Sequence, residues 1–474
     1  MNRRSRLSAA PALPAAAAVV FAALAVPAAS LDAQAPGRGG GDAPVQRPLP
    51  TPRGSANIQV LGHVPLGGPF TVSDIELEQE LSRPYAYVSR MFGQAGFDVV
   101  DLSDPDHPSI IHRWRIENAE LHRGTGAMDV KYFISEGDYY VVQSVQFQQG
   151  GPDANLGAVV FDVSDLPDDP PEEVARITYP ESPGGFHNIF MYKHSDGRPL
   201  LFATTTGEVT NVYDMKRVVE GEDSTLVARI PVPDNPIGEV MGFDGYHDFY
   251  VGYHPESGQD RYYGGGAGGY YVWDVTDLQD MELVASVTGV AGLNWGHTIT
   301  PTPDGRYFVG ETEYQYAPLR IFDLKPALDG DQQSVSRVTS AWTPDWRNLA
   351  HNHEMRWPYV FVSAYEDGLQ VFNMMDAENP FTVAYFDTYP GPHKTGMCGD
   401  NICNGAFGVD VRNADGLIVV SDMATGFWAF RMDGFEGWNG LGWGVPDISS
   451  AQDWRNGPRG HGMQGGGAPV GMED

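Results

Sequence analysis

The chain repeats one sequence unit about seven times, and this repetition constrains its fold more than any other feature. The clearest copies read GFDVVDLSD from residue 96, GAVVFDVSD from residue 157 and GYYVWDVTD from residue 269. Weaker copies begin at residues 211, 319 and 368, and a shortened copy begins at residue 426. One marker position recurs at intervals of about 50 to 60 residues, as Asp101, Asp162, Asp214, Asp274, Asp323, Asn373 and Arg431.

Each copy has the pattern of short β-strands. An alternating apolar run ends in the marker, a turn with Ser or Thr, Asp and often Pro follows, and a second β-type run comes next. Two more short β-type runs precede each copy, as FHNIFMY and PLLFATT do in the third unit. Four strands in about 50 residues is the period of a propeller blade. The sequence therefore predicts an all-β fold, a seven-bladed β-propeller, over residues 57–436.

The two ends of the repeat region predict how the ring closes. The seventh unit lacks its final strand, whereas NIQVLGHVPL at residues 57–66 resembles a final strand and has no unit of its own. We expect this N-terminal strand to complete the last blade, because the pairing would remove two free sheet edges.

The runs FDVVDLSD, AVVFDVSD and YVWDVTD resemble those of the LVIVD-repeat proteins, over nearly all of residues 57–433. The third and fifth units depart from the motif, with Asp214-Met215-Lys216 and Asp323-Leu324-Lys325 in place of the Asp-x-Ser-Asp turn. The resemblance implies a propeller. It also implies an exported or surface protein, in a family whose members mostly lack an assigned activity.

The N-terminus has the three parts of an export signal. Arg3, Arg4 and Arg6 are followed by an apolar run from Ala15 to Val26 and by small residues that end in Ala33-Gln34-Ala35. We therefore expect a signal peptide at 1–35, a flexible Gly/Pro-rich linker at 36–56 and an irregular tail at 437–474. The mature protein would be periplasmic or secreted. After residue 30 no apolar stretch is long enough for a transmembrane segment.

The net charge narrows the classes of binding partner, and the two cysteines indicate a disulfide. A formal charge of −32 disfavours nucleic acid, which leaves a small molecule or another extracellular protein as the expected partner. The two cysteines, Cys398 and Cys403, favour a disulfide over a metal site, because no second pair exists and disulfides persist outside the cell.

Four histidines recur at one phase of the repeat, early in the first strand of four successive units. The shared pattern is His, then a polar residue, then an apolar residue. Equivalent positions of a rotationally symmetric ring lie on one circle around its axis, so these side chains should converge in the central channel. The four are His187, His247, His297 and His353.

Convergent imidazoles suit a transition metal such as Fe, Cu or Zn. Metal-bound histidines usually donate their other N–H to a carboxylate or carbonyl. Carboxylates on the same or adjoining inner strands could take this supporting role: Asp248, Glu311, Glu313, Glu354 and Glu366. The alternative is that the histidines only hydrogen-bond water and backbone in a polar channel.

A second, partly cationic group would line the mouth of the channel and receive an anionic ligand. Ordinary loop polarity is the competing interpretation for each member. The group is His122, Arg123, His351, His393 and Lys394.

Three functions are compatible with these sequence features. The first is a metalloenzyme, an oxidoreductase or hydrolase, with catalytic residues unknown. The second is a non-catalytic exported scaffold propeller, and the third is a metal-binding protein without turnover. The chain has no G-x-S-x-G, P-loop or H-E-x-x-H motif. We favour a propeller that binds a metal or small ligand on its axis, with catalysis undecided.

Overall fold

The computed structural model describes most of the repeat region and a short C-terminal piece. It describes residues 53–438 except for short gaps, together with 452–455 and 457–458. The gaps are residues 69, 148–150, 182–183, 206, 235–243, 255, 315, 332–333, 346–348, 390 and 392–403. The expected signal peptide and most of the expected linker and tail lie outside the described residues, as do Cys398 and Cys403.

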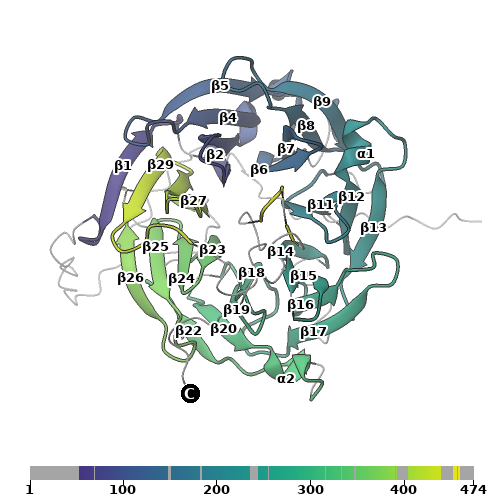
Figure 1. Cartoon of the computed structure of the whole chain (residues 1–474), viewed down its shortest axis with the longest axis vertical. Helices are drawn as coiled ribbons and strands as arrows, with labels where there is room; N and C mark the ends of the chain where they lie inside the picture. The colour runs from purple at the N-terminus through teal and green to yellow at the C-terminus, as the bar shows by residue number, and fades with distance from the viewer. Residues whose placement is uncertain are drawn as a thin grey trace, which may run out of the picture.

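Seven small sheets stand side by side around a common axis (Figure 1), so the prediction of an all-β, seven-bladed β-propeller is confirmed. We number the blades in chain order. Blade 1 contains β2 (Val72–Leu77), β3 (Tyr85–Arg90), β4 (Gly96–Asp101) and β5 (Ser109–Arg115). Blade 2 contains β6 (Gly126–Ser135), β7 (Asp138–Gln146), β8 (Leu156–Asp162) and β9 (Glu172–Thr178). Blade 3 contains β10 (Ile189–Lys193), β11 (Pro199–Thr204), β12 (Val209–Asp214) and β13 (Leu226–Pro231).

The second half of the ring has the same plan. Blade 4 contains β14 (Tyr246–His254), β15 (Gln259–Gly266), β16 (Gly269–Asp274) and β17 (Glu282–Thr288), with β21 (Ser334–Val335) added in parallel to β17. Blade 5 contains β18 (Thr298–Pro301), β19 (Tyr307–Glu311), β20 (Leu319–Asp323) and β22 (Ser340–Trp342). Blade 6 contains β23 (Asn352–Arg356), β24 (Tyr359–Ser363), β25 (Leu369–Asn373) and β26 (Phe381–Phe386). Blade 7 contains β27 (Ala406–Val411), β28 (Ile418–Asp422), β29 (Gly426–Met432) and β1 (Ile58–Val64).

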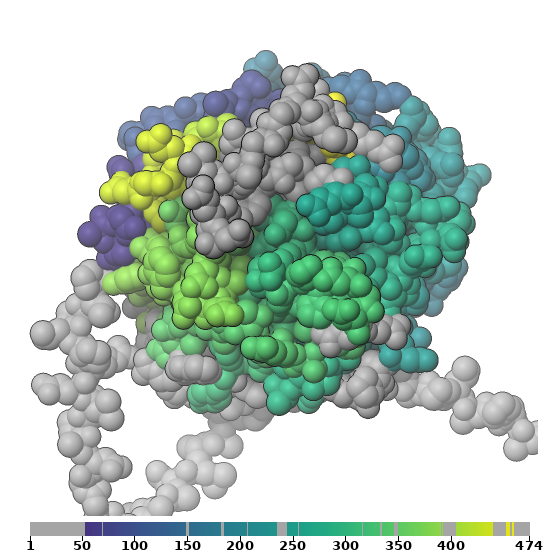
Figure 2. Space-filling view, turned by 60° about the horizontal axis from the view of Figure 1, so that its bottom comes forward, coloured from purple at the N-terminus to yellow at the C-terminus, as the bar shows by residue number. Residues whose placement is uncertain are grey.

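The N-terminal strand closes the ring as the sequence predicts. β1 pairs antiparallel with β29, from Ile58 opposite Met432 to Val64 opposite Phe427. In the space-filling view the purple N-terminal residues lie beside the yellow residues of the last blade (Figure 2), and the pairing of β1 with β29 joins the two ends of the repeat region in one sheet.

The inner strands are buried on both faces because each sheet packs between two others, whereas outer strands such as β5 and β9 are partly exposed. Every described residue of β2, β3 and β28 is buried, although their sequences mix polar and apolar side chains. The turn after the third strand is stabilised by the marker aspartate. The carboxylates of Asp101, Asp162 and Asp274 accept the backbone N–H two residues further on, at 2.8–2.9 Å.

The described helices are short and lie in connections. Where the third and fifth repeats depart from the common turn, a short α-helix follows the marker instead. Asp214 and Asp323 there accept backbone N–H groups of the first helical turn. These are α1 (Met215–Val219) and α2 (Lys325–Leu328), and the 3₁₀ turns are η1 (Phe92–Gln94) and η2 (Ala119–Leu121).

The first strand of each blade lies nearest the axis. Neighbouring first strands contact one another around the whole ring, which creates the site where side chains from different blades meet. These strands are β2, β6, β10, β14, β18, β23 and β27.

Residues 452–455 dock inside the ring, at the end of β10 that lies away from His187 (Figure 1, short yellow segment). The Gln452 side chain accepts the Lys193 N–H and donates to the Met191 carbonyl. Trp454 is buried in the core of blades 1 to 3, and Arg455 pairs with Glu80 at 2.8 Å. Part of the tail that the sequence predicts to be irregular therefore has a defined place.

Candidate metal centre

Four histidines from successive blades form a row at one end of the axis. His187 lies just before β10, His247 lies in β14, His297 just before β18 and His351 just before β23. The ring centroids are 4.4 Å apart for His187 and His247, 4.2 Å for His247 and His297, and 5.1 Å for His297 and His351. The row follows the inner strands of blades 3 to 6.

Three members of this row have the same backbone position in their blades. Each donates its backbone N–H to the carbonyl of the last residue of the second strand. The three side chains therefore start from equivalent positions in their blades. The acceptors for His187, His297 and His351 are Thr204, Glu311 and Ser363, at 3.1, 2.8 and 2.9 Å.

His353 does not take the position that the sequence pattern indicates for it. It pairs with Val362 inside β23, two residues beyond His351, and its Nε2 faces the Val309 carbonyl oxygen at 3.2 Å. The fourth member of the row is His351, which the sequence pattern assigns to the channel mouth. The difference arises because the sequence HNHE offers two histidines, and the strand register places the first of them in line with His187 and His297.

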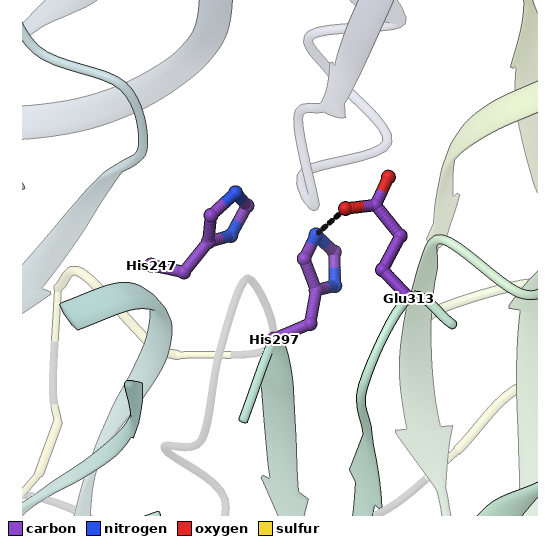
Figure 3. A group of neighbouring side chains, drawn as sticks. All are labelled: His247, His297 and Glu313. Atoms are coloured by element: carbon purple, nitrogen blue, oxygen red, sulfur yellow. Dashed lines mark ion pairs between the residues drawn. The ribbon is translucent and has the colours of Figure 1, made fainter. Parts of the chain in front are cut away.

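A compact group of possible metal ligands lies at the middle of the row. One nitrogen each of His247 and His297 and one carboxylate oxygen of Glu313 lie within 4.8 Å of one another. Figure 3 shows His297 between the other two side chains, with Glu313 approaching from the loop after β19. The Glu313 Oε2 atom is 3.4 Å from His297 Nε2. Two imidazoles and one carboxylate are a set that binds iron or zinc and leaves coordination positions open.

An oxygen faces the Nδ1 atom of three histidines in the row, and two of these contacts are hydrogen bonds. With Nδ1 facing an oxygen, the proton belongs on Nδ1 and the lone pair on Nε2, which is the tautomer that a metal ligand needs. The hydrogen-bond acceptors are Gln146 Oε1 for His187 at 3.2 Å and the Phe407 carbonyl for His351 at 2.7 Å, whereas Glu311 Oε2 lies 2.8 Å from His297 Nδ1 without the geometry of a hydrogen bond.

The His297 side chain is fully buried, yet neither of its ring nitrogens makes a hydrogen bond of good geometry. A carboxylate oxygen lies near each nitrogen, from Glu311 beside Nδ1 and from Glu313 beside Nε2. A buried polar atom without a hydrogen bond is costly in a folded protein. A cation that accepts the Nε2 lone pair and neutralises the nearby carboxylate would satisfy this arrangement.

Burial keeps the row uncharged. It lowers the pKa of His187 and of His351 to about 4, and the neighbouring imidazoles act in the same direction. Burial likewise lowers the pKa of His247 and His297 well below the usual value. At neutral pH all four rings are therefore neutral and able to donate a lone pair.

The carboxylates beside the row are shifted in the opposite direction. Burial raises the pKa of Glu313, and it raises that of Glu311 well above the usual range, with the charge of Glu313 as a further cause. Burial also raises the pKa of Asp248 to about 7. Titratable groups with pKa values pushed apart in one small region are typical of functional sites.

The opposite side of the same end is apolar. Residues of blades 1, 2, 6 and 7 form this apolar wall. It contacts the histidine row at His351, whose ring centroid is 3.8 Å from that of Phe407. Its buried members are Met91, Met128, Leu349, Tyr365, Phe407 and Met423.

The other carboxylates that the sequence singles out have different surroundings. The Asp248 side chain accepts the backbone N–H of Phe249, next to it in β14. Glu354 lies deeper along the axis, where it accepts from Tyr250 and pairs with Arg356 at 2.9 Å. Glu366 is buried directly after Tyr365. Glu311 contacts an imidazole as expected, whereas Glu313 faces the histidines as a possible ligand rather than as an outer support.

The predicted mouth group does not gather as one cluster in the described part of the chain. His122 stacks on Phe147 in blade 2, while Arg123 is exposed. His351 belongs to the histidine row. His393 and Lys394 lie outside the described residues.

Two side chains at the centre are not indicated by the histidine pattern, Gln146 and Tyr365. Gln146 ends the second strand of blade 2, and Tyr365 follows the second strand of blade 6. The histidine pattern concerns only first strands at equivalent phase. The same comparison at the ends of second strands would have aligned Tyr365 with Glu313, two residues after Ser363 and Glu311.

The fold and the site together define a class of protein, a seven-bladed β-propeller with a His–His–Glu group near its axis that can hold a metal ion. No protein-family model matches the chain, and a search of curated proteins found no match either. Among the described residues, no helix has the length and apolar character needed to cross a membrane.

Proposed function

We propose that this propeller binds one transition-metal ion at the axial end of blades 3 to 6, through His247, His297 and Glu313. The observation that carries the proposal is the approach of these three ligand atoms to within 4.8 Å, around an imidazole whose buried nitrogens lack good hydrogen bonds. Imidazole and carboxylate ligands together suit iron, zinc or copper. His187 and His351 flank the group and can enlarge the ligand set.

The charge of the chain supports a cationic ligand. The formal net charge of −32 attracts cations to the surface, and the row itself carries no positive charge that would repel them. The chain thus offers long-range attraction and a local set of neutral donors.

A catalytic role is the second candidate, and one observation favours it. Two histidines and one glutamate fill only part of a coordination sphere, and open positions are what a catalytic metal needs. A metal there would supply Lewis-acid or redox chemistry to a small molecule. In either case Glu311, whose Oε2 lies 2.8 Å from His297 Nδ1, would orient the His297 ring when a metal binds.

We further propose that the protein acts outside the cytoplasm and that its repeats belong with the LVIVD type. The basic and apolar N-terminus with its Ala33-Gln34-Ala35 site supports export. The sequence runs FDVVDLSD, AVVFDVSD and YVWDVTD support the second part, and the three aspartates of these runs make equivalent turns in their blades.

Metal titration of the apo protein tests the proposed centre. The full mature chain, stripped with a chelator, should bind about one Zn²⁺ or Co²⁺ per chain. His247→Gln should weaken binding by more than the roughly 10–100-fold that loss of an outer partner produces. The readouts are competition with a chromophoric chelator and metal analysis after dialysis.

His254→Gln is the matched control, because His254 lies on the same strand β14 at its other end. Its two ring nitrogens face Ser257 and the Asp304 carbonyl, so its loss should leave metal affinity unchanged. An apo protein that folds but binds no metal, or equal loss of affinity in both variants, would overturn the proposal.

A further inference from the structure

A buried tyrosine from the next blade contacts the candidate ligand Glu313. The Tyr365 hydroxyl donates to Glu313 Oε1 at 2.6 Å, and Tyr365 is only 3% exposed. Glu313 comes from the loop after β19 of blade 5, whereas Tyr365 comes from the loop after β24 of blade 6. The contact therefore joins two blades at the candidate metal centre.

Both partners have an unfavourable backbone conformation. Glu313 has φ 51° and Tyr365 has φ 42°, in the left-handed region that non-glycine residues rarely occupy. Such a conformation persists only where its surroundings hold it, most often at functional sites. Tyr365 is held by two backbone hydrogen bonds to Ala406, of 3.0 and 2.8 Å.

The two oxygens of Glu313 have different neighbours. Oε1 accepts from Tyr365, while Oε2 faces His297 Nε2 at 3.4 Å. A carboxylate with one oxygen engaged by a phenol has one oxygen left for a metal.

We propose that Tyr365 is a positioning residue that holds Glu313 as a one-oxygen ligand and thereby sets the metal preference of the centre. This inference rests on the proposed function. A one-oxygen carboxylate beside two imidazoles favours a transition metal. Ca²⁺, in contrast, takes six to eight oxygen ligands and often a two-oxygen carboxylate. Tyr365 also leaves a coordination position open that a chelating Glu313 would fill.

Tyr365→Phe tests the inference, because it removes the hydroxyl and keeps the ring. Zn²⁺ affinity should fall by about 10–100-fold, the range found when an outer partner is lost. In the Co²⁺ form the visible absorption should weaken and shift, because release of Oε1 lets Glu313 chelate and raises the coordination number. A role limited to folding would leave this spectrum unchanged in the protein that remains folded.

Tyr87→Phe is the matched control. The Tyr87 hydroxyl donates to Glu78 Oε1 at 2.5 Å and is fully buried, but it lies in blade 1, whereas the histidine row lies on blades 3 to 6. The control loses the same kind of hydrogen bond and should keep the wild-type Zn²⁺ affinity and Co²⁺ spectrum.

X-ray absorption of the Zn²⁺-loaded wild-type protein provides a readout that needs no variant. A one-oxygen carboxylate should lack the close carbon neighbour that a chelating carboxylate places near the metal. Zinc bound with a chelating carboxylate, or a Tyr365→Phe protein with wild-type affinity and spectrum, would overturn the inference. A wild-type protein that binds no metal would instead overturn the proposed function.

Discussion

At the residue scale, the centre shows that phase within a strand decides which side chains meet. His351 and His353 are two residues apart, and only His353, followed by Glu354 and Met355, matches the pattern His, polar, apolar. The backbone bond of His351 to Ser363 repeats the bond of His297 to Glu311, so His351 continues the row. His353 instead directs Nε2 to the Val309 carbonyl.

The depressed pKa of His351 predicts a pH-dependent contribution to stability. Burial lowers the folded-state pKa to about 4, whereas an unfolded histidine titrates near 6.5. Between these values the unfolded chain binds the extra proton, so wild-type stability is lost as pH falls from about 6.5 to 4.

His351→Gln removes this titration and keeps a donor for the Phe407 carbonyl. We expect the stability of the metal-free wild type relative to this variant to fall by on the order of 1 kcal/mol per pH unit in that window. Urea unfolding at several pH values measures it. A difference that stays constant from pH 6.5 to 4 would show that His351 is not buried as a neutral ring.

At the element scale, the closing strand β1 depends on close contact with blade 1 as well as on pairing with β29. Gly62 lies at a register shift in β1, opposite Ala429. A Cβ at Gly62 would lie 2.3 Å from Pro108 Cδ and 2.8 Å from the Pro105 carbonyl, both in the turn between β4 and β5. One of these atoms belongs to a proline ring and the other to the backbone, so neither can rotate away as the end of a flexible side chain could.

Gly62→Ala should therefore destabilise the ring closure. We expect a loss of about 1–3 kcal/mol in the free energy of unfolding, which is typical of overpacking. Gly68→Ala is the control, because a Cβ at Gly68 would have no atom within 4 Å and the substitution should be close to neutral. Equal stability of the two variants in urea unfolding would mean that β1 is not held against blade 1.

At the scale of the whole molecule, the proposed metal ligands come from two neighbouring blades, so blades 4 and 5 must pack against each other before the centre exists. His247 belongs to blade 4, and His297 and Glu313 belong to blade 5. At the other end of the axis, residues 452–455 also connect different blades, because they contact blades 1 to 3.

Export is a prediction about the whole chain, and its processing can be measured. Expressed in a bacterial host with its own N-terminus, the protein should appear outside the cytoplasm with about the first 30 to 35 residues removed. N-terminal sequencing of that material gives the cut, which falls either after Ala35 or earlier, among the small residues Ala28 to Ser30 that follow the apolar run. Full-length protein that begins at Met1 and stays in the cytoplasm would contradict export.

The sequence by itself determined the repeat, the seven blades and the N-terminal strand that closes them. These features depend on local alternation, on turn residues and on a period that can be counted along the chain. It also indicated that histidines would meet near the axis, because equivalent residues in a ring point to a common centre.

Only the tertiary structure decided which side chains meet. It placed His351 in the row, brought Glu313 toward the imidazoles as a possible ligand, and paired Tyr365 with Glu313 across two blades. The physical reason is that a slip of one or two residues between equivalent strands changes which side chain reaches the axis. A repeat pattern does not record that slip, whereas the hydrogen-bond register of the folded blades does.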